Sequence, residues 1–423
     1  MAGGSAGERL SAADASNLVM DASDQVNVFL MAGLVRPGGF VMPDGSVDID
    51  LLRTGIAARL TDAAAAGPDR LTQRVTSHGR GFVWEHCEPD LAEHVRLVAP
   101  VDGTQGLARL CASLMTTPMP GGRPLWEVLV VPGAWAYGPG VVVRFHHAVS
   151  DGVGAIPLVE RLLGQGPYVQ PVAPAPRGMA RRRPTLRALV RGTGRVVAAF
   201  RSTVAPTVLL GAISDQRGVA FVDVALDALS LGAKASGGTV NDALLAAVAM
   251  AAEEALVAGG HPVPRSIPAS VPVALSDRGR SGNAVGIMRV ELPTGEADPS
   301  RRVAAVAALT RTAKSEARDQ GTFELTRSRW GQRVFAGLAR RQRFVALFVT
   351  NVRGPSEQLA LGGAPLERAW ALTPIQGNVR LGVSALSYGG RLGCAVHVDA
   401  TALSVDALAS ALRARLAQIA GEH

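Results

Sequence analysis

The segment VVVRFHHAVSDGVG, residues 141–154, carries the clearest structural signal in the chain. Its β-branched run predicts a strand that ends at two adjacent histidines, His146 and His147. Neighbouring residues on a strand point to opposite faces, so one imidazole faces the protein body and the other faces a cleft beyond the strand end. An imidazole in such a cleft can act as a general base, because its ordinary pKa lies close to neutral pH.

Two residues beyond the histidine pair can shape the loop that follows the strand. Asp151 can hold this turn by pairing with an arginine or by accepting backbone N–H groups at the start of a helix predicted over 150–164. Gly152 allows the chain to turn tightly. The histidine segment contains no nucleophile elbow, phosphate-binding loop or dinucleotide fingerprint, so a catalytic histidine here would act directly on a substrate hydroxyl. The residues alone leave open a second interpretation, in which both histidines are structural.

The length of 423 residues suggests two domains or one two-lobed unit. Both halves contain strand-like and helix-like segments, which indicates a mixed α/β fold. The clearest segments are the adjacent strands 126–132 and 140–146, the hairpin 381–399, and the helices 150–164, 237–260 and 404–421. A stretch rich in Pro and Gly interrupts the pattern at 164–178. We therefore expect an N-terminal lobe over 1–165, a linker over 166–205 and a C-terminal lobe over 206–423.

The cysteine and histidine spacing and the N-terminal sequence argue against a metal-binding, a secreted or a membrane-spanning protein. The three cysteines form no CxxC pair and the eight histidines show no zinc spacing, so we expect no metal site. Cys87, Cys111 and Cys394 are best explained as small buried side chains in a reducing cytoplasm. The first residues resemble no signal peptide, and no apolar stretch reaches transmembrane length. We predict a cytoplasmic protein, at most peripheral to a membrane.

The formal net charge of +8 is concentrated in one part of the chain. Residues 161–214 contain nine arginines and no acidic residue, which argues against a nucleic-acid partner for the whole protein. Within this part, Arg183, Arg187, Arg191 and Arg195 recur every four residues and would form one stripe on a helix. Two interpretations stay open: a solvated surface face, or contact with a CoA phosphate or an anionic membrane or lipid-droplet surface.

Several motifs in order resemble one enzyme family. HHAVSDG is similar to the HHxxxDG signature of CoA-dependent acyltransferases. Further matches narrow this to the bacterial wax ester synthase/diacylglycerol acyltransferases. They are LSAADASNLVMD (10–21), RPLWEVLVV (123–131), GGTVNDALLAAVA (237–249), ELPTGEADPSRRV (291–303) and TNVRGPSEQLALGGAPL (350–366). The resemblance reaches from about residue 10 to the C-terminus, and the order of the motifs makes it specific.

The resemblance implies a fold and a reaction. The fold would be α/β (α+β), with two chloramphenicol-acetyltransferase-like lobes, mixed sheets and an active-site tunnel between them. The reaction would use acyl-CoA as co-substrate, an alcohol as acceptor and no permanently bound cofactor. By resemblance His147 is the catalytic base, Asp151 orders its loop and Gly152 is the hinge. We group His146 with these catalytic residues. Because adjacent strand residues point to opposite faces, we expect His146 to be a buried residue that supports His147.

The other motifs imply residues that shape the substrate site. The residues that match them are Asn241, Asp242, Pro124, Leu125, Trp126 and Asn351. By resemblance the Asn-Asp pair shapes the site from the second lobe, and Asn241 is a candidate donor to an oxyanion. The Pro-Leu-Trp segment is structural or lines the pocket, and for Trp126 a core role is equally open.

Departures from the family pattern bear on substrate choice. Arg353 replaces a proline in NVRGP, and the segment 25–30 reads QVNVFL where an MHVG-like turn is usual. The acidic residue that usually precedes RPLW is missing, and the chain is short for the family. We expect an enzyme that forms wax ester or triacylglycerol. Two alternatives stay open: a specialised-metabolite acyltransferase that accepts an acyl carrier protein as donor, and a catalytically silent lipid-binding relative.

Overall fold

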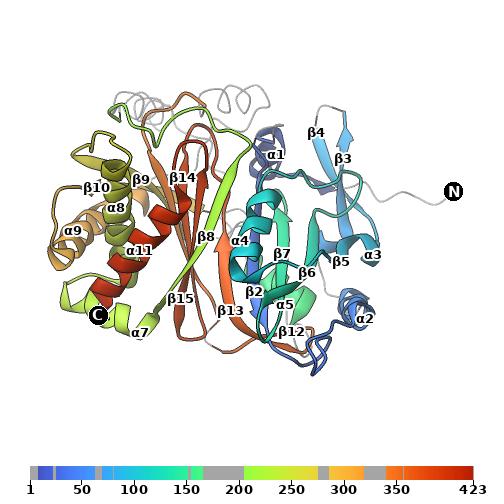
Figure 1. The fold of residues 1–423 in the computed structure, drawn as a ribbon. Coiled ribbons are helices and arrows are strands. Elements are labelled where there is room, and N and C mark those ends of the chain that lie inside the picture. Colours follow the sequence, from blue (N-terminus) through green and yellow to red (C-terminus); the bar gives the residue numbers. More distant parts are fainter. Residues whose placement is uncertain are drawn as a thin grey trace.

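Two six-stranded mixed sheets form the frame of the protein in this computed structural model (Figure 1). The structure describes residues 8–21, 25–61, 69–79, 81–150, 154–164, 204–274, 285–318, 340–355 and 357–422. A smaller sheet of β1 (Glu8–Arg9), β4 (Gly81–His86) and β3 (Gln73–His78) lies in the N-terminal half.

The first large sheet, called the N-terminal sheet, contains the histidine strand. Its order is β12 (Ala360–Leu361), β13 (Ala364–Leu372), β2 (Val28–Val35), β7 (Gly138–His146), β6 (Trp126–Trp135) and β5 (Val95–Leu97). The adjacent antiparallel strands β6 and β7 confirm the predicted pair. Alternate residues of β7 enter two cores. One core contains α2 (Ile49–Thr61) and α5 (Ala155–Leu163), and the other contains α4 (Gly103–Leu114).

One strand of this sheet comes from the far end of the chain. β13 pairs antiparallel with β2 from Leu30 to Val35, although the two strands are more than 300 residues apart. Its side chains Leu366 and Trp370 are buried in different cores, so both faces of the strand gain from apolar burial. The predicted lobes comprise residues 1–165 and 206–423. β13 belongs to the second of these ranges in sequence, but it pairs within the N-terminal sheet.

The second large sheet, called the C-terminal sheet, carries four helices. Its order is β10 (Val285–Pro293), β9 (Ser266–Ala274), β11 (Leu347–Arg353), β14 (Leu381–Tyr388), β15 (Arg391–Asp399) and β8 (Arg217–Ala225). The helices are α7 (Leu226–Ala235), α8 (Val240–Ala258), α9 (Pro299–Arg318) and α11 (Val405–Ala420). They lie together on the side away from the N-terminal sheet (Figure 1). The hairpin and the helices α8 and α11 confirm the sequence predictions. Gly389 and Gly390 form the turn with φ of +54° and +72°, a conformation that favours glycine.

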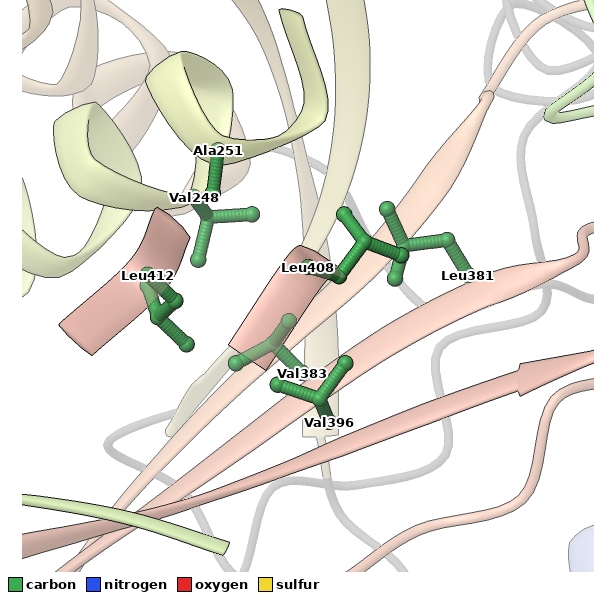
Figure 2. Close-up of a pocket in the computed structure, with 7 residues that line it drawn as sticks. All are labelled: Val248, Ala251, Leu381, Val383, Val396, Leu408 and Leu412. Atoms are coloured by element: carbon green, nitrogen blue, oxygen red, sulfur yellow. The ribbon is translucent and has the colours of Figure 1, made fainter. Parts of the chain in front are cut away.

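A small cavity in the C-terminal lobe is a gap in this core (Figure 2). It lies between α8, α11 and the strands β14 and β15. It is lined by Val248, Ala251, Leu381, Val383, Val396, Leu408 and Leu412. All seven side chains are aliphatic and none can donate or accept a proton, so this cavity supplies no chemistry.

The remaining described elements are short. They include α1 (Ala12–Val19), which begins where the Asp14 N–H donates to Ser11 Oγ (3.1 Å), and α3 (Leu91–His94). No helix among the described residues has the length and apolar content needed to cross a membrane. Cys111 and Cys394 are buried as expected, whereas Cys87 is partly exposed.

Candidate functional site

The histidine pair stands at the end of β7, between two neighbouring strands. The His146 N–H donates to the Leu125 carbonyl (3.1 Å), just before β6. The His147 N–H donates to the Asn27 carbonyl (2.9 Å), just before β2. The backbone of the pair is therefore held from both sides, and the two side chains point to opposite faces of the sheet.

His146 is a buried residue that shapes the loop. The Ala148 N–H donates to Nδ1 of His146 (2.9 Å), which places the proton of a neutral ring on Nε2. Nε2 lies 2.9 Å from Oδ2 of Asp21, to which it can donate. The side chain is only 2% exposed. With both ring nitrogens engaged by the protein, His146 is suited to support the loop rather than to exchange protons with a substrate.

His147 is more exposed than its neighbour. It is partly exposed, and its ring lies tilted against Phe29 with 4.8 Å between the ring centres. Burial lowers the pKa of His147 to about 4, and the nearby His146 lowers it further, while Asp21 and the Ser150 backbone oppose this shift. The imidazole is therefore neutral at pH 7 and has a nitrogen lone pair that can accept a proton.

Three polar residues of the N-terminal segment surround the histidine loop. Asn17 Nδ2 donates to the His147 carbonyl (3.0 Å). Asn27 Nδ2 donates to the backbone carbonyl and to Oδ1 of Asn17 (3.1 and 3.0 Å). The Asn27 N–H donates to Oδ1 of Asp21 (2.6 Å), whose other oxygen faces His146. Sequence reasoning missed all three, although LSAADASNLVMD and QVNVFL, which contain them, were among the segments compared with the family.

A buried ion pair lies on the His146 face of the sheet. Arg144 Nη1 lies 2.6 Å from Oε1 of Glu127, directly across the β6–β7 ladder, and both side chains are almost fully buried. The partly exposed Arg96 reaches the other oxygen of Glu127 (3.0 Å). Burial lowers the pKa of Arg144, and Glu127 opposes that effect. The pair fixes the strand two residues before the first histidine.

The Pro-Leu-Trp segment packs beneath the site. Pro124 and Leu125 are buried, and the Leu125 carbonyl holds His146. Trp126 is 1% exposed, donates from Nε1 to the Leu71 carbonyl (2.8 Å), and its ring lies tilted against His94 with 4.4 Å between ring centres. These contacts favour the core role for Trp126 over a pocket-lining role.

The Asn-Asp pair begins helix α8. Oδ2 of Asp242 accepts from the Thr239 N–H (2.9 Å) and Oγ1 (2.7 Å), which closes a capping box. Oδ1 accepts from Thr310 Oγ1 of α9 (2.6 Å). These partners all lie in the C-terminal lobe, so the described contacts tie Asp242 to the helix layer and do not bring it to His147. Asn241 is partly exposed in the first helical turn, and its substrate role stays a prediction.

The remaining predicted residues divide into described and undescribed positions. Asn351 is partly exposed on β11, opposite Ala385 of β14. Asp151 and Gly152 lie outside the described residues, as does the Arg183–Arg195 stripe. No cluster of three or more metal-binding side chains occurs in the described part of the chain.

An apolar pocket is lined by residues of both large sheets. It is lined by Met31, Ile156, Val159, Pro355, Leu359, Leu366, Ala369, Leu386 and Tyr388. These residues come from β2, α5, the NVRGP segment, β13 and β14. Met31 follows Phe29 by two residues, so both side chains lie on one face of β2, the face on which Phe29 touches the His147 ring. The Tyr388 hydroxyl donates to the Leu366 carbonyl (2.9 Å) and accepts from the Leu359 N–H (2.8 Å). This satisfies the one polar group of the lining.

Comparisons with known proteins agree on one family. A sequence model of the wax ester synthase/diacylglycerol acyltransferase catalytic domain matches residues 10–205, and one of the C-terminal domain matches 281–420. A candidate diacylglycerol O-acyltransferase of Mycobacterium tuberculosis is 28% identical over 395 residues, covering 83% of each chain.

Solved structures show the same fold at low identity. The wax ester synthase/diacylglycerol acyltransferase from Marinobacter aquaeolei VT8 superposes with a TM-score of 0.71 at 22% identity, covering 98% of this chain and 100% of that one. The first condensation domain of the calcium-dependent antibiotic synthetase gives 0.63 at 16% identity, covering 99% and 97%. The predicted α/β fold with mixed sheets is confirmed, whereas the tunnel between the lobes stays a prediction.

Proposed function

Since the chain belongs to the wax ester synthase/diacylglycerol acyltransferase family and is an acyltransferase, we propose its reaction and its catalytic base. The enzyme transfers an acyl group from acyl-CoA to the hydroxyl of a long-chain alcohol or a diacylglycerol, and His147 is the general base. The product is a wax ester or a triacylglycerol. The observation that carries this proposal is the partly exposed, neutral His147, whose pKa is lowered to about 4 and whose ring lies against Phe29.

The proposed reaction needs one proton acceptor and no covalent enzyme intermediate. His147 takes the hydroxyl proton while the alcohol oxygen attacks the thioester carbonyl carbon. The tetrahedral intermediate then expels the CoA sulfur, and His147 returns the proton to that sulfur, so free CoA thiol and ester leave. General-base catalysis of this kind contributes about 10²- to 10⁴-fold. The oxyanion needs a hydrogen-bond donor, and Asn241 remains the residue predicted for it.

The lining of the apolar pocket suits a hydrocarbon tail in its chemistry, but the cavity of about 20 Å³ would have to widen to hold one. Eight of its nine lining residues are wholly apolar, and Tyr388 uses its hydroxyl on backbone groups of the protein. A tail placed there lies along the β2 face that leads through Met31 and Phe29 to His147. Burial of each methylene group contributes about 0.8 kcal/mol to binding, which favours long chains over short ones.

Release of free CoA thiol tests the proposed reaction. Purified protein receives acyl-CoAs of several chain lengths together with a long-chain alcohol, a diacylglycerol or a polar hydroxyl compound. We expect thiol release to require an acceptor, to increase with chain length and to accompany ester formation. Release without ester would indicate hydrolysis. Release with none of the pairs would contradict the proposal and favour a carrier-protein donor or a silent relative.

The pH profile tests the protonation state of the base. A base whose pKa is lowered stays unprotonated as the pH falls, until the pH approaches about 4. We therefore expect kcat/KM for thiol release to stay level from about pH 8 to about pH 5.5, one unit below the ordinary histidine pKa. An acid limb centred near 6.5 would contradict the lowered pKa of His147. Burial also lowers the pKa of His94 and His397, so circular dichroism must show that the protein remains folded.

A further inference from the structure

A loop from the C-terminal half reaches the N-terminal segment beside the histidines. Residues 373–380, called the Gln376 loop, connect β13 to β14. Gln376 Nε2 donates to Oδ1 of Asn27 (2.6 Å). Gln25 exchanges two hydrogen bonds with Gly377: its Nε2 donates to the Gly377 carbonyl (2.9 Å) and its Oε1 accepts the Gly377 N–H (2.8 Å). Three hydrogen bonds therefore join parts of the chain about 350 residues apart.

The Gln376 loop is itself held firmly by its own half. Asn378 Oδ1 accepts from Nε2 of Gln342 (2.8 Å), and Asn378 Nδ2 donates to the Gln342 carbonyl (2.7 Å). Both side chains are buried. The Gly211 N–H donates to the Asn378 carbonyl (2.9 Å). Because its own half holds the Gln376 loop in place, the contact of this loop with Asn27 can position the residues that Asn27 contacts in turn, Asn17 and His147.

The side-chain amides beyond Gln376 form a relay with a defined direction. Because Gln376 donates to Oδ1 of Asn27, the Nδ2 group of Asn27 points to Asn17 and donates to its Oδ1 (3.0 Å). Asn17 must then present its own Nδ2 to the His147 carbonyl (3.0 Å). Each amide has one donor end and one acceptor end, and the His147 carbonyl can only accept, so the relay has one consistent direction with Gln376 as its first donor.

We infer that Gln376 is a positioning residue for His147, acting through Asn27 and Asn17. The relay holds the carbonyl of His147, while the Asn27 carbonyl holds its N–H, so the backbone of the base is fixed on both sides. This inference rests on the proposed function of His147 as the base. Gln376 contacts neither histidine in the described hydrogen bonds, so its effect is on the geometry of the base and not on proton transfer itself.

Replacement of Gln376 tests the relay. Gln376→Met keeps length and neutrality but removes the donor, and Gln376→Glu replaces the donor with an acceptor. A misplacement of about 1 Å at a reacting group can cost about 10²-fold in rate, so we expect kcat to fall by up to that factor while KM changes little. Gln418→Glu is the matched control, because its exposed side chain on α11 can still accept from Arg415. The inference is overturned if kcat in both Gln376 variants equals that of the control.

A double-variant cycle separates the relay from general loosening of the fold. Asn17→Asp still accepts from Asn27 but cannot donate to the His147 carbonyl, so it breaks the last link. If Gln376 acts through Asn17, adding Gln376→Met to Asn17→Asp lowers kcat no further. If the two losses multiply, the residues act independently and the relay is wrong.

A measurement that does not need turnover distinguishes failure of the relay from failure of the proposed reaction. Titration of His147 by NMR in histidine-labelled protein should show a pKa well below 6.5 in the wild type. In Gln376→Met we expect the His147 pKa to rise toward 6.5, because a displaced ring gains water. An unchanged titration overturns the relay. A wild type that titrates as described but releases no CoA thiol contradicts the proposed reaction and leaves the positioning result intact.

Discussion

His147→Ala should lower kcat for CoA thiol release by about 10²- to 10⁴-fold, the usual contribution of a general base. The loss follows from the removal of the neutral imidazole that lies against Phe29 of β2 and is the proposed proton acceptor. KM should change little, because the proton acceptor is needed in the transition state and contributes little to ground-state binding. Rates are measured by thiol release with a long-chain acyl-CoA and alcohol.

His78→Ala is the matched control for this variant. His78 is exposed at the end of β3 in the small sheet, so its loss removes an imidazole away from β7. Both variants should unfold near the wild-type temperature, because His147 is partly exposed and its backbone contacts do not depend on the ring. A His147→Ala protein that keeps most of its activity would show that another group is the base.

Glu127→Ala should destabilise the protein by about 3–5 kcal/mol, the usual cost of leaving a buried charge unpaired. Arg144 is 2% exposed and would keep its charge next to an empty site. Replacing both partners with apolar residues, as in Glu127→Leu with Arg144→Met, should recover most of the loss, because the buried charge is then gone. Chemical unfolding followed by tryptophan fluorescence measures the change, since Trp126 adjoins Glu127.

Glu85→Ala provides the comparison for an exposed pair of the same geometry. Glu85 faces Arg74 directly across the β3–β4 ladder at 3.0 Å, but both side chains are well exposed. Its loss should cost less than about 1 kcal/mol, because water already screens the pair. If Glu127→Ala and Glu85→Ala lower the free energy of unfolding by the same amount, burial of the Glu127–Arg144 pair does not make its disruption more destabilising, and the prediction is wrong.

Local patterns in the sequence predicted the elements around the site but not the contacts between them. The strand 140–146, the hairpin at Gly389-Gly390 and the long helices depend on periodicity and turn residues within a few positions. Helix α8 begins at a local signal of this kind, since Thr239 caps it and Asp242 three residues later completes the capping box.

Such local patterns do not predict contacts between residues that are far apart in the sequence. Nothing in QVNVFL indicates that Asn27 meets Gln376, because the hydrogen bond joins residues 349 positions apart. The family resemblance predicted Asp242 as a residue that shapes the site, which stays a prediction, and the sequence did not indicate that its oxygens accept from Thr239 and Thr310 within the helix layer. A motif match identifies a residue type at a position, and only the packed structure shows which groups that residue contacts.

The exchange of β13 into the N-terminal sheet sets an order for synthesis on the ribosome. β2 and β7 emerge early, but the partner that covers the other edge of β2 follows β7 by more than 200 residues. At about 5–20 residues per second, that edge waits for roughly 10–45 seconds with unpaired backbone groups. The nascent chain therefore exposes an aggregation-prone strand edge through most of its translation, which makes its folding yield sensitive to translation rate and to chaperones that shield such edges.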